Sequence, residues 1–183
     1  MEAARRILLS RHGRLELAAV VAEAGTTTGA VYHHFGSRGG LLRAVVEGFY
    51  RRLDDEILQL AMPGGSWAAR ERERIRRLVD LAYGEPLAPV LFGLVLREPA
   101  IALLDAERTT RLVDMGTEHL RRGQAAGEVR RDVDPAIAAA LVMGGLRQAI
   151  GRALAQDPRP PAATLTEDLA RVVQALADPG ARR

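Results

Sequence analysis

Between residues 27 and 39 the sequence TTTGAVYHHFGSR brings hydroxyl, phenol, imidazole and guanidinium groups close together. Hydroxyls and imidazoles donate hydrogen bonds to phosphate oxygens and reach the edges of bases, and arginine pairs with phosphate. Imidazoles also bind metals and act in catalysis. The segment is therefore a candidate for DNA binding, for metal binding or for an active site.

The histidines of the chain do not have the spacing of a metal site. His33 and His34 are adjacent, so on a helix they point about a third of a turn apart and do not chelate one ion. His12 and His119 are isolated, and the chain has no cysteine. Motifs such as H-E-x-x-H, a nucleophile elbow or a glycine-rich phosphate loop are also missing. We expect no metal, no cofactor and no catalytic residue.

Composition excludes some further classes. The 183 residues are 48% hydrophobic and 27% charged, and all 26 basic groups are arginines against 23 acids, for a net charge of +3. The net charge therefore does not predict nucleic-acid binding, and such a prediction must rest on where the arginines lie. The N-terminal apolar run is too short for a signal peptide. The longest uncharged run, 135–146, is shorter than the ~20 residues of a membrane span, and we expect a cytoplasmic protein that binds no membrane.

Helix formers dominate the sequence and period-2 alternation is scarce, which predicts an all-α fold. Ser37, Ser66 and the pair Asp134-Pro135 are expected helix starts, and Thr164 with Glu167 has the spacing of a capping box. About nine helices are expected, over 2–11, 17–24, 27–34, 37–61, 66–83, a short one ending at 97, one from 99 to 123 or 127, 135–155, and one from 164 onward.

The second and third expected helices fit a helix-turn-helix, because both are short and a glycine-containing turn joins them. Val31 and Phe35 lie four residues apart and should face inward. Arg38 follows in the next helix, where it would meet the DNA backbone. The alternative is a solvated helix face, but a tyrosine and a histidine beside an arginine favour DNA. The candidate DNA contacts are Thr27, Thr28, Gly29, Tyr32, His33 and Arg38.

The segment LAAVVAEAGTTTGAVYHHFGSRGGLLRAVVE (17–47) resembles the DNA-binding domain of the TetR family of bacterial transcriptional regulators. The matching features are Val20-Val21, Ala24-Gly25, Tyr32-x-x-Phe35, Ser37-Arg38 and Leu41-Leu42. The segment 127–141 resembles the sequence that leads into the family's dimerisation helices. The resemblance implies a DNA-binding domain over residues 1–46 and a helical ligand-binding and dimerisation domain over 47–183. It also implies that Tyr32 and Arg38 contact phosphate.

Three positions depart from the family pattern. Thr26 stands where an apolar residue is usual, and Glu16 stands where a serine or threonine usually caps the second helix, although Arg14 is near enough in sequence to compensate. The first expected helix begins almost at Met1, so the basic arm that many relatives carry before it is missing, which either an upstream start codon or weak DNA binding would explain. Glu16 and the missing arm favour an alternative, a helical small-molecule binding or scaffold protein whose DNA affinity is weak or lost. A helical enzyme is a third, more distant alternative.

The expected helix 135–155 is apolar on more than one side, which is typical of a helix buried all round. In a chain of this size, one side would pack internally and the other against a second subunit. The alternative is a plain monomer core. The candidate dimer contacts are Ile137, Leu141, Gly144, Gly145, Gln148, Leu169 and Val173.

The middle of the chain contains aromatic and methionine side chains and one imidazole. In TetR relatives this region often surrounds an inducer pocket, and such residues suit an apolar ligand with one polar anchor. They suit an ordinary core equally well. The candidate pocket residues are Trp67, Tyr83, Phe92, Met115 and His119. The partners implied are a double-stranded DNA operator, a second copy of the chain and an apolar small-molecule effector, as for a ligand-responsive repressor.

Overall fold

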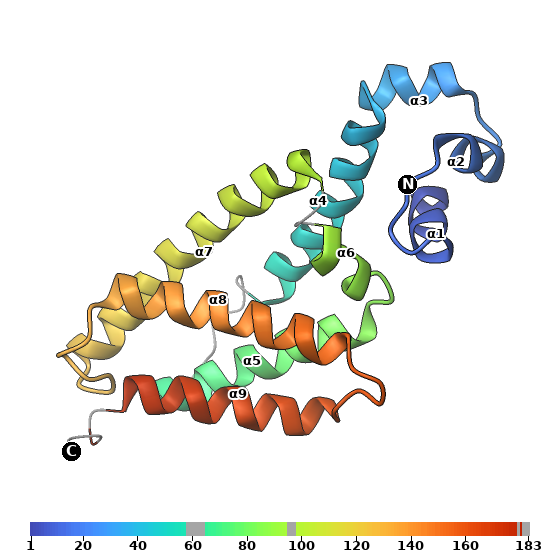
Figure 1. Cartoon of the computed structure of the whole chain (residues 1–183). Helices are drawn as coiled ribbons and strands as arrows, with labels where there is room; N and C mark the ends of the chain where they lie inside the picture. Colours follow the sequence, from blue (N-terminus) through green and yellow to red (C-terminus); the bar gives the residue numbers. More distant parts are fainter. Residues whose placement is uncertain (58–64, 95–97, 179, 181–183) are drawn as a thin grey trace. The chain divides into compact units, whose positions relative to one another are not determined.

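The computed structural model describes residues 1–57, 65–94, 98–178 and 180, and over these residues the fold is all-helical, as predicted. The nine helices of the described residues, labelled in Figure 1, are α1 (Glu2–Ser10), α2 (Leu17–Ala24), α3 (Thr28–Phe35), α4 (Arg38–Ile57), α5 (Trp67–Gly84), α6 (Ala88–Leu94), α7 (Pro99–Ala125), α8 (Pro135–Leu154) and α9 (Ala162–Ala177).

The helices belong to two compact units. The first unit comprises Met1–Asp55 and Glu85–Ala106, and the second comprises Glu56–Gly84 and Glu107–Arg183. The first therefore contains α1 to α3, most of α4, α6 and the start of α7. The second contains α5, the rest of α7, α8 and α9. The division of the chain into domains after residue 46 stays a prediction.

Capping residues set several of the helix starts that the sequence predicts. The hydroxyl oxygen of Ser37 accepts a hydrogen bond from the Gly40 N–H at 2.9 Å, and the Ser66 hydroxyl accepts one from the Ala69 N–H at 3.3 Å. The Asp134 carboxylate accepts hydrogen bonds from the backbone N–H groups of Ala136 and Ile137, both at 2.9 Å. Such caps satisfy N–H groups that have no partner within the helix.

The capping box predicted at Thr164 is wrong. Helix α9 starts two residues earlier, at Ala162, with Pro161 as its N-cap and no capping bond from a side chain. Thr164 therefore lies inside the first turn, and Glu167 is bound instead by Arg72 of α5. The ends predicted at residues 61 and 97 lie outside the described residues.

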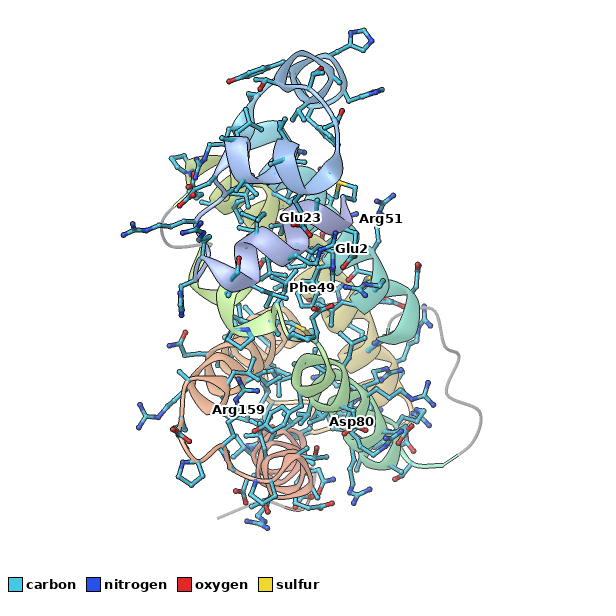
Figure 2. The ribbon with its side chains drawn as sticks, turned by 90° about the vertical axis from the view of Figure 1, so that its right-hand side faces the viewer. Glu2, Glu23, Phe49, Arg51, Asp80 and Arg159 are labelled. Atoms are coloured by element: carbon cyan, nitrogen blue, oxygen red, sulfur yellow. The ribbon has the colours of Figure 1, made fainter. Side chains whose placement is uncertain are left out.

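Helix α4 supplies much of the core of the first unit. Its apolar side chains recur every three or four residues, and five of them are at most 2% exposed. This spacing places them on one face of the helix; Figure 2 labels one of them, Phe49. Successive turns of α1 contribute the buried Ala4 and Leu8. The five α4 residues are Leu41, Leu42, Val45, Val46 and Phe49.

A buried carboxylate ties separate helices of the first unit together. Glu85 is 7% exposed, and its oxygens accept hydrogen bonds from Arg5 Nη2 of α1 at 2.9 and 3.0 Å and from Arg52 Nη2 of α4 at 2.5 Å. It also accepts from the Leu87 N–H at 3.0 Å. Burial alone would raise the pKa of Glu85, but the Leu87 N–H and the two arginines outweigh it and lower the pKa. The carboxylate stays charged because it is fully partnered.

In the second unit α5, α8 and α9 lie side by side (Figure 1). Ile75 and Val79 of α5, Ile150 of α8 and Val173 of α9 are at most 5% exposed. The Tyr83 hydroxyl donates to the Pro160 carbonyl at 3.0 Å, which joins the end of α5 to the loop before α9. Apolar burial and peripheral polar bonds thus hold this unit together.

Candidate DNA-binding interface

Helix α3 has one buried side and one exposed side, as the spacing predicts. Val31 is 6% exposed, and Phe35 is partly buried. On the other side Thr28, Tyr32 and His33 are all exposed, Tyr32 by 48%. The exposed side is therefore made of hydroxyl, phenol and imidazole groups. We call it the α3 face and define it as Thr27, Thr28, Gly29, Tyr32 and His33.

The N-terminus of α3 opens onto this face. Gly25, in a left-handed conformation with φ of 60°, ends α2, and Thr27 caps α3 by accepting a hydrogen bond from the Ala30 N–H at 3.2 Å. The accepting role leaves the Thr27 O–H able to donate elsewhere. A helix N-terminus also favours negative charge, because its N–H groups and dipole point toward it. The arrangement suits a phosphate or a base edge.

The fold itself does not require a glycine at residue 29. A Cβ atom built there would meet only the Thr27 hydroxyl oxygen, at an ordinary 3.8 Å. At Gly40, by contrast, a Cβ would collide with the carbonyl oxygen of Phe35. A helical glycine costs about 1 kcal/mol relative to alanine. Because Gly29 is exposed and has no side chain, the α3 backbone at this residue is open to close approach by a partner.

Arg38 is the first residue of α4 and is held by two acceptors. Its Nε donates to the buried Leu15 carbonyl at 2.9 Å, and its Nη2 donates to Glu98 Oε1 at 3.3 Å. The side chain remains 45% exposed. The first bond fixes the orientation of the guanidinium at the start of α4, and the second gives it a carboxylate partner.

The carboxylates of α1 and α2 lie beside arginines. Arg6 Nε donates to Glu23 at 2.7 Å and its Nη1 lies 3.9 Å from Glu2, so these two acids share one arginine. Figure 2 labels both acids. Glu16 makes no capping bond at the start of α2, and Arg11 Nε lies 3.9 Å from it. Exposed pairs of this kind are worth at most about 1 kcal/mol, but each one reduces the negative field that an approaching DNA would meet.

A second exposed surface has the opposite chemistry. On α8, Ile137 is 62% and Leu141 61% exposed, and Gly144, Gly145 and Gln148 follow on the same exposed side. A Cβ at either glycine would meet nothing within 4 Å. On α9, Val172 is 61% and Leu176 39% exposed. We call these seven residues the α8–α9 surface.

The other two predicted dimer contacts are less exposed. Val173 is 5% exposed and points into the second unit, and Leu169 is partly buried. The exposed apolar residues of α9 are instead Val172 and Leu176. By length and composition alone α8 is also apolar enough to cross a membrane, a property that our sequence analysis did not expect and that core helices of soluble proteins share.

Four of the five predicted ligand residues lie in the second unit, and Phe92 lies in the first. Trp67 is 6% exposed and lines a small cavity with room for about one water molecule (≈ 10 Å³). Met115 is 37% exposed. Burial, together with the charges of Arg74 and Arg122, lowers the pKa of the half-buried His119, so its imidazole is neutral at pH 7. The structure does not gather these residues around one described cavity.

Sequence reasoning did not single out Glu85 or Glu98. Their arginine partners lie 33 to 80 residues away in sequence, and no local pattern marks such a pairing. A glutamate next to Pro86 or Pro99 signals only a helix boundary. Only the fold brings these carboxylates to the arginines.

The short helices α2 and α3 are joined by a turn at Gly25, and α3 is capped and polar on its exposed side. These features define the class, a helical protein with an N-terminal helix-turn-helix. Residues 1–45 match the family model of bacterial regulatory proteins, tetR family. This match identifies the N-terminal helix-turn-helix of the chain as that of the TetR family of transcriptional regulators.

Individual relatives agree with this assignment. The HTH-type transcriptional regulatory protein RaaS of Mycobacterium tuberculosis is 29% identical over 126 residues, which are 68% of this chain and 56% of RaaS. The matched part thus spans little more than half the length of this curated relative.

Solved structures show the same fold. The fatty acid degradation regulator FadR of Bacillus halodurans has a TM-score of 0.80 at 17% identity, covering 100% of this chain and 94% of its own. FadR of Bacillus subtilis, solved in complex with stearoyl-CoA, has a TM-score of 0.75 at 15% identity and covers 96% of each chain. At these identities the likeness concerns the fold alone.

Proposed function

We propose that the protein is a cytoplasmic, homodimeric repressor that binds an inverted-repeat operator and releases it when a small apolar effector binds. The α3 face is the observation that carries the DNA-binding part of this proposal. It combines exposed hydrogen-bonding groups, a helix N-terminus and a glycine that the fold does not require. A second helix of this kind enters the major groove in helix-turn-helix proteins.

The proposed roles of the α3 face and of the neighbouring Arg38 combine side-chain chemistry with the family resemblance. Thr28 and His33 are short enough to read base edges, whereas Tyr32 and Arg38 are suited to phosphate. Gly29 allows the α3 backbone to approach the DNA. Thr27 both caps α3 and offers its O–H to a phosphate.

The α8–α9 surface supports the homodimer. Exposed isoleucine, leucine and valine beside two adjacent glycines form an apolar patch, and patches of this kind mark interaction sites. The glycines let a second α8 approach closely. Two-fold symmetry of the dimer would then pair two α3 helices with two half-sites of an inverted repeat.

The proposed effector has an apolar chain, because a structural neighbour was solved with stearoyl-CoA. The half-buried His119 is the polar anchor that we propose, with Trp67 and Met115 as apolar contacts. A ligand releases DNA only if it prefers the conformation that binds DNA poorly.

Binding to DNA from upstream of the protein's own gene, measured by fluorescence anisotropy over a series of salt concentrations, tests the proposal. We expect affinity to fall steeply with salt and to exceed that for a scrambled duplex by at least ~10³-fold. Equal affinity for both duplexes would refute sequence-specific regulation. A candidate effector should weaken operator binding by ~5–150-fold, and operator should weaken effector binding by the same factor.

One observation favours a second candidate function, a helical binding protein that has lost DNA affinity. Glu16 is the exposed N-cap residue of α2 and makes no capping bond with its side chain. Its negative charge would repel a DNA phosphate at this helix start. The same titration separates the two functions, because a protein of the second kind would bind the effector and neither duplex.

A further inference from the structure

The guanidinium of Arg38 is shared between a backbone carbonyl and a carboxylate of the same unit. Nε donates to the Leu15 carbonyl at 2.9 Å, in a partly buried bond whose acceptor residue is 2% exposed. Nη2 donates to Glu98 Oε1 at 3.3 Å across 60 residues of sequence. The carboxylate is the more exposed of the two acceptors, with the Glu98 side chain 28% exposed.

This arrangement limits how Arg38 can bind phosphate. Arginine grips an oxyanion best with two parallel N–H bonds from one edge of the guanidinium. The edge that includes Nε is committed to Leu15, so the edge formed by Nη1 and Nη2 is left for a phosphate. Glu98 takes one N–H of Nη2 and places a negative charge beside that edge, so a phosphate that approaches the edge competes with Glu98 for the guanidinium.

The position of Glu98 is fixed by the start of α7. Its carbonyl accepts hydrogen bonds from the Ile101 N–H at 2.9 Å and the Ala102 N–H at 3.0 Å, and Pro99 is the first residue of the helix. A shift in the start of α7 would therefore carry the carboxylate toward or away from Arg38.

We propose that Glu98 competes with a DNA phosphate for Arg38 and is an autoinhibitory contact that lowers the protein's affinity for DNA. The inference rests on the proposed DNA-binding function. Because Glu98 is tied to α7, the competition also gives the start of that helix a direct influence on the DNA contact. A carboxylate in this place carries no sequence information, so it weakens binding to every duplex alike.

The Glu98→Gln substitution tests the inference, because the amide keeps the shape of the side chain and removes its charge. An exposed pair has a small free energy, so we expect operator and scrambled duplex to bind about two- to fivefold more tightly. In an Arg38→Ala background the same substitution should change neither affinity. The control is Glu47→Gln, which removes a more exposed carboxylate (40%) that Arg43 binds at 2.7 Å on α4; its effect should be the same with and without Arg38.

The outcomes separate the two proposals. If wild type binds the operator and Glu98→Gln changes nothing, the competition is refuted. If Glu98→Gln tightens binding equally in the Arg38→Ala background, the effect is a long-range charge effect and the competition is again refuted. If none of the variants binds any duplex, the proposed DNA-binding function itself has failed.

Discussion

The α3 face and the α8–α9 surface are both exposed, and they differ in almost every chemical respect. The α3 face has hydroxyl, phenol and imidazole groups with an arginine beside it. The α8–α9 surface has aliphatic side chains and two adjacent glycines, with Gln148 as its polar member. A polar surface of the first kind suits a hydrated, charged partner, whereas the second is stabilised when another apolar surface covers it.

The two surfaces share one feature, which is glycine that the fold does not demand. A Cβ fits at Gly29, Gly144 and Gly145 without any close contact, whereas at Gly123 it would come within 2.5 Å of the Val129 side chain. Glycine at these positions costs about 1 kcal/mol of helix stability and leaves the backbone open to close approach. The comparison thus separates glycines that the fold requires from glycines that it does not.

Replacing a glycine of the α8–α9 surface should have the largest effect. Gly144→Arg leaves the monomer without a clash and raises the helix propensity of α8, so the fold should survive. A charged side chain in an apolar interface should prevent association, which sedimentation will detect. DNA affinity should fall with it by at least ~100-fold, because the second half-site no longer adds to the first.

The matched control is Gly84→Arg, which makes the same change at an exposed glycine at the end of α5, where a Cβ also meets nothing within 4 Å. That variant should remain dimeric and bind DNA normally. A stable dimer of Gly144→Arg would show that the interface lies elsewhere on the chain.

Sequence predicted the α3 face better than the rest because local constraints act there. Short helices, a turn glycine and the inward pair Val31 and Phe35 leave only one face of α3 exposed. On α9 the periodic apolar residues did not tell which neighbours lie inside, and Val173 proved buried where Val172 is exposed. Contacts across the chain, such as Arg38 with Glu98, have no sequence signal because they depend on how the helices pack.

The Glu85→Ala substitution should separate the two surfaces by stability. It removes a buried carboxylate and leaves Arg5 and Arg52 without their shared partner, which we expect to lower the free energy of unfolding by about 2–3 kcal/mol. Because these residues lie in the first unit, amide hydrogen exchange should accelerate in that unit, including α3, more than in α8 and α9. Glu47→Ala, which breaks an exposed pair, should cost less than about 1 kcal/mol. Equal costs would show that burial of Glu85 does not matter.

Substitutions of the α3 face and of the neighbouring Arg38 should distinguish base contacts from phosphate contacts. His33→Ala should cost ~1–3 kcal/mol at one base position of each half-site and relax the preference there. Arg38→Ala should weaken binding to every sequence and reduce the salt slope by ~1 without changing the preferred site. Anisotropy with a panel of single-base operator variants checks both. Two variants that changed affinity alone would contradict the assignment of His33 to a base.

The smallest effect should come from His119, which belongs to neither surface. Burial and the charges of Arg74 and Arg122 disfavour its protonated form and lower its pKa below the usual 6.5. Between that lowered pKa and about 6.5 the unfolded chain binds a proton that the folded chain does not. The free energy of unfolding should therefore decrease as the pH falls through this window and change no further below the folded pKa.

His119→Gln cannot titrate, so the difference in pH dependence between the two proteins isolates this one group. NMR titration of the imidazole gives the folded pKa directly, and a value at or above 6.5 would contradict the buried, cation-flanked environment. An effector that contacts His119 should shift this titration.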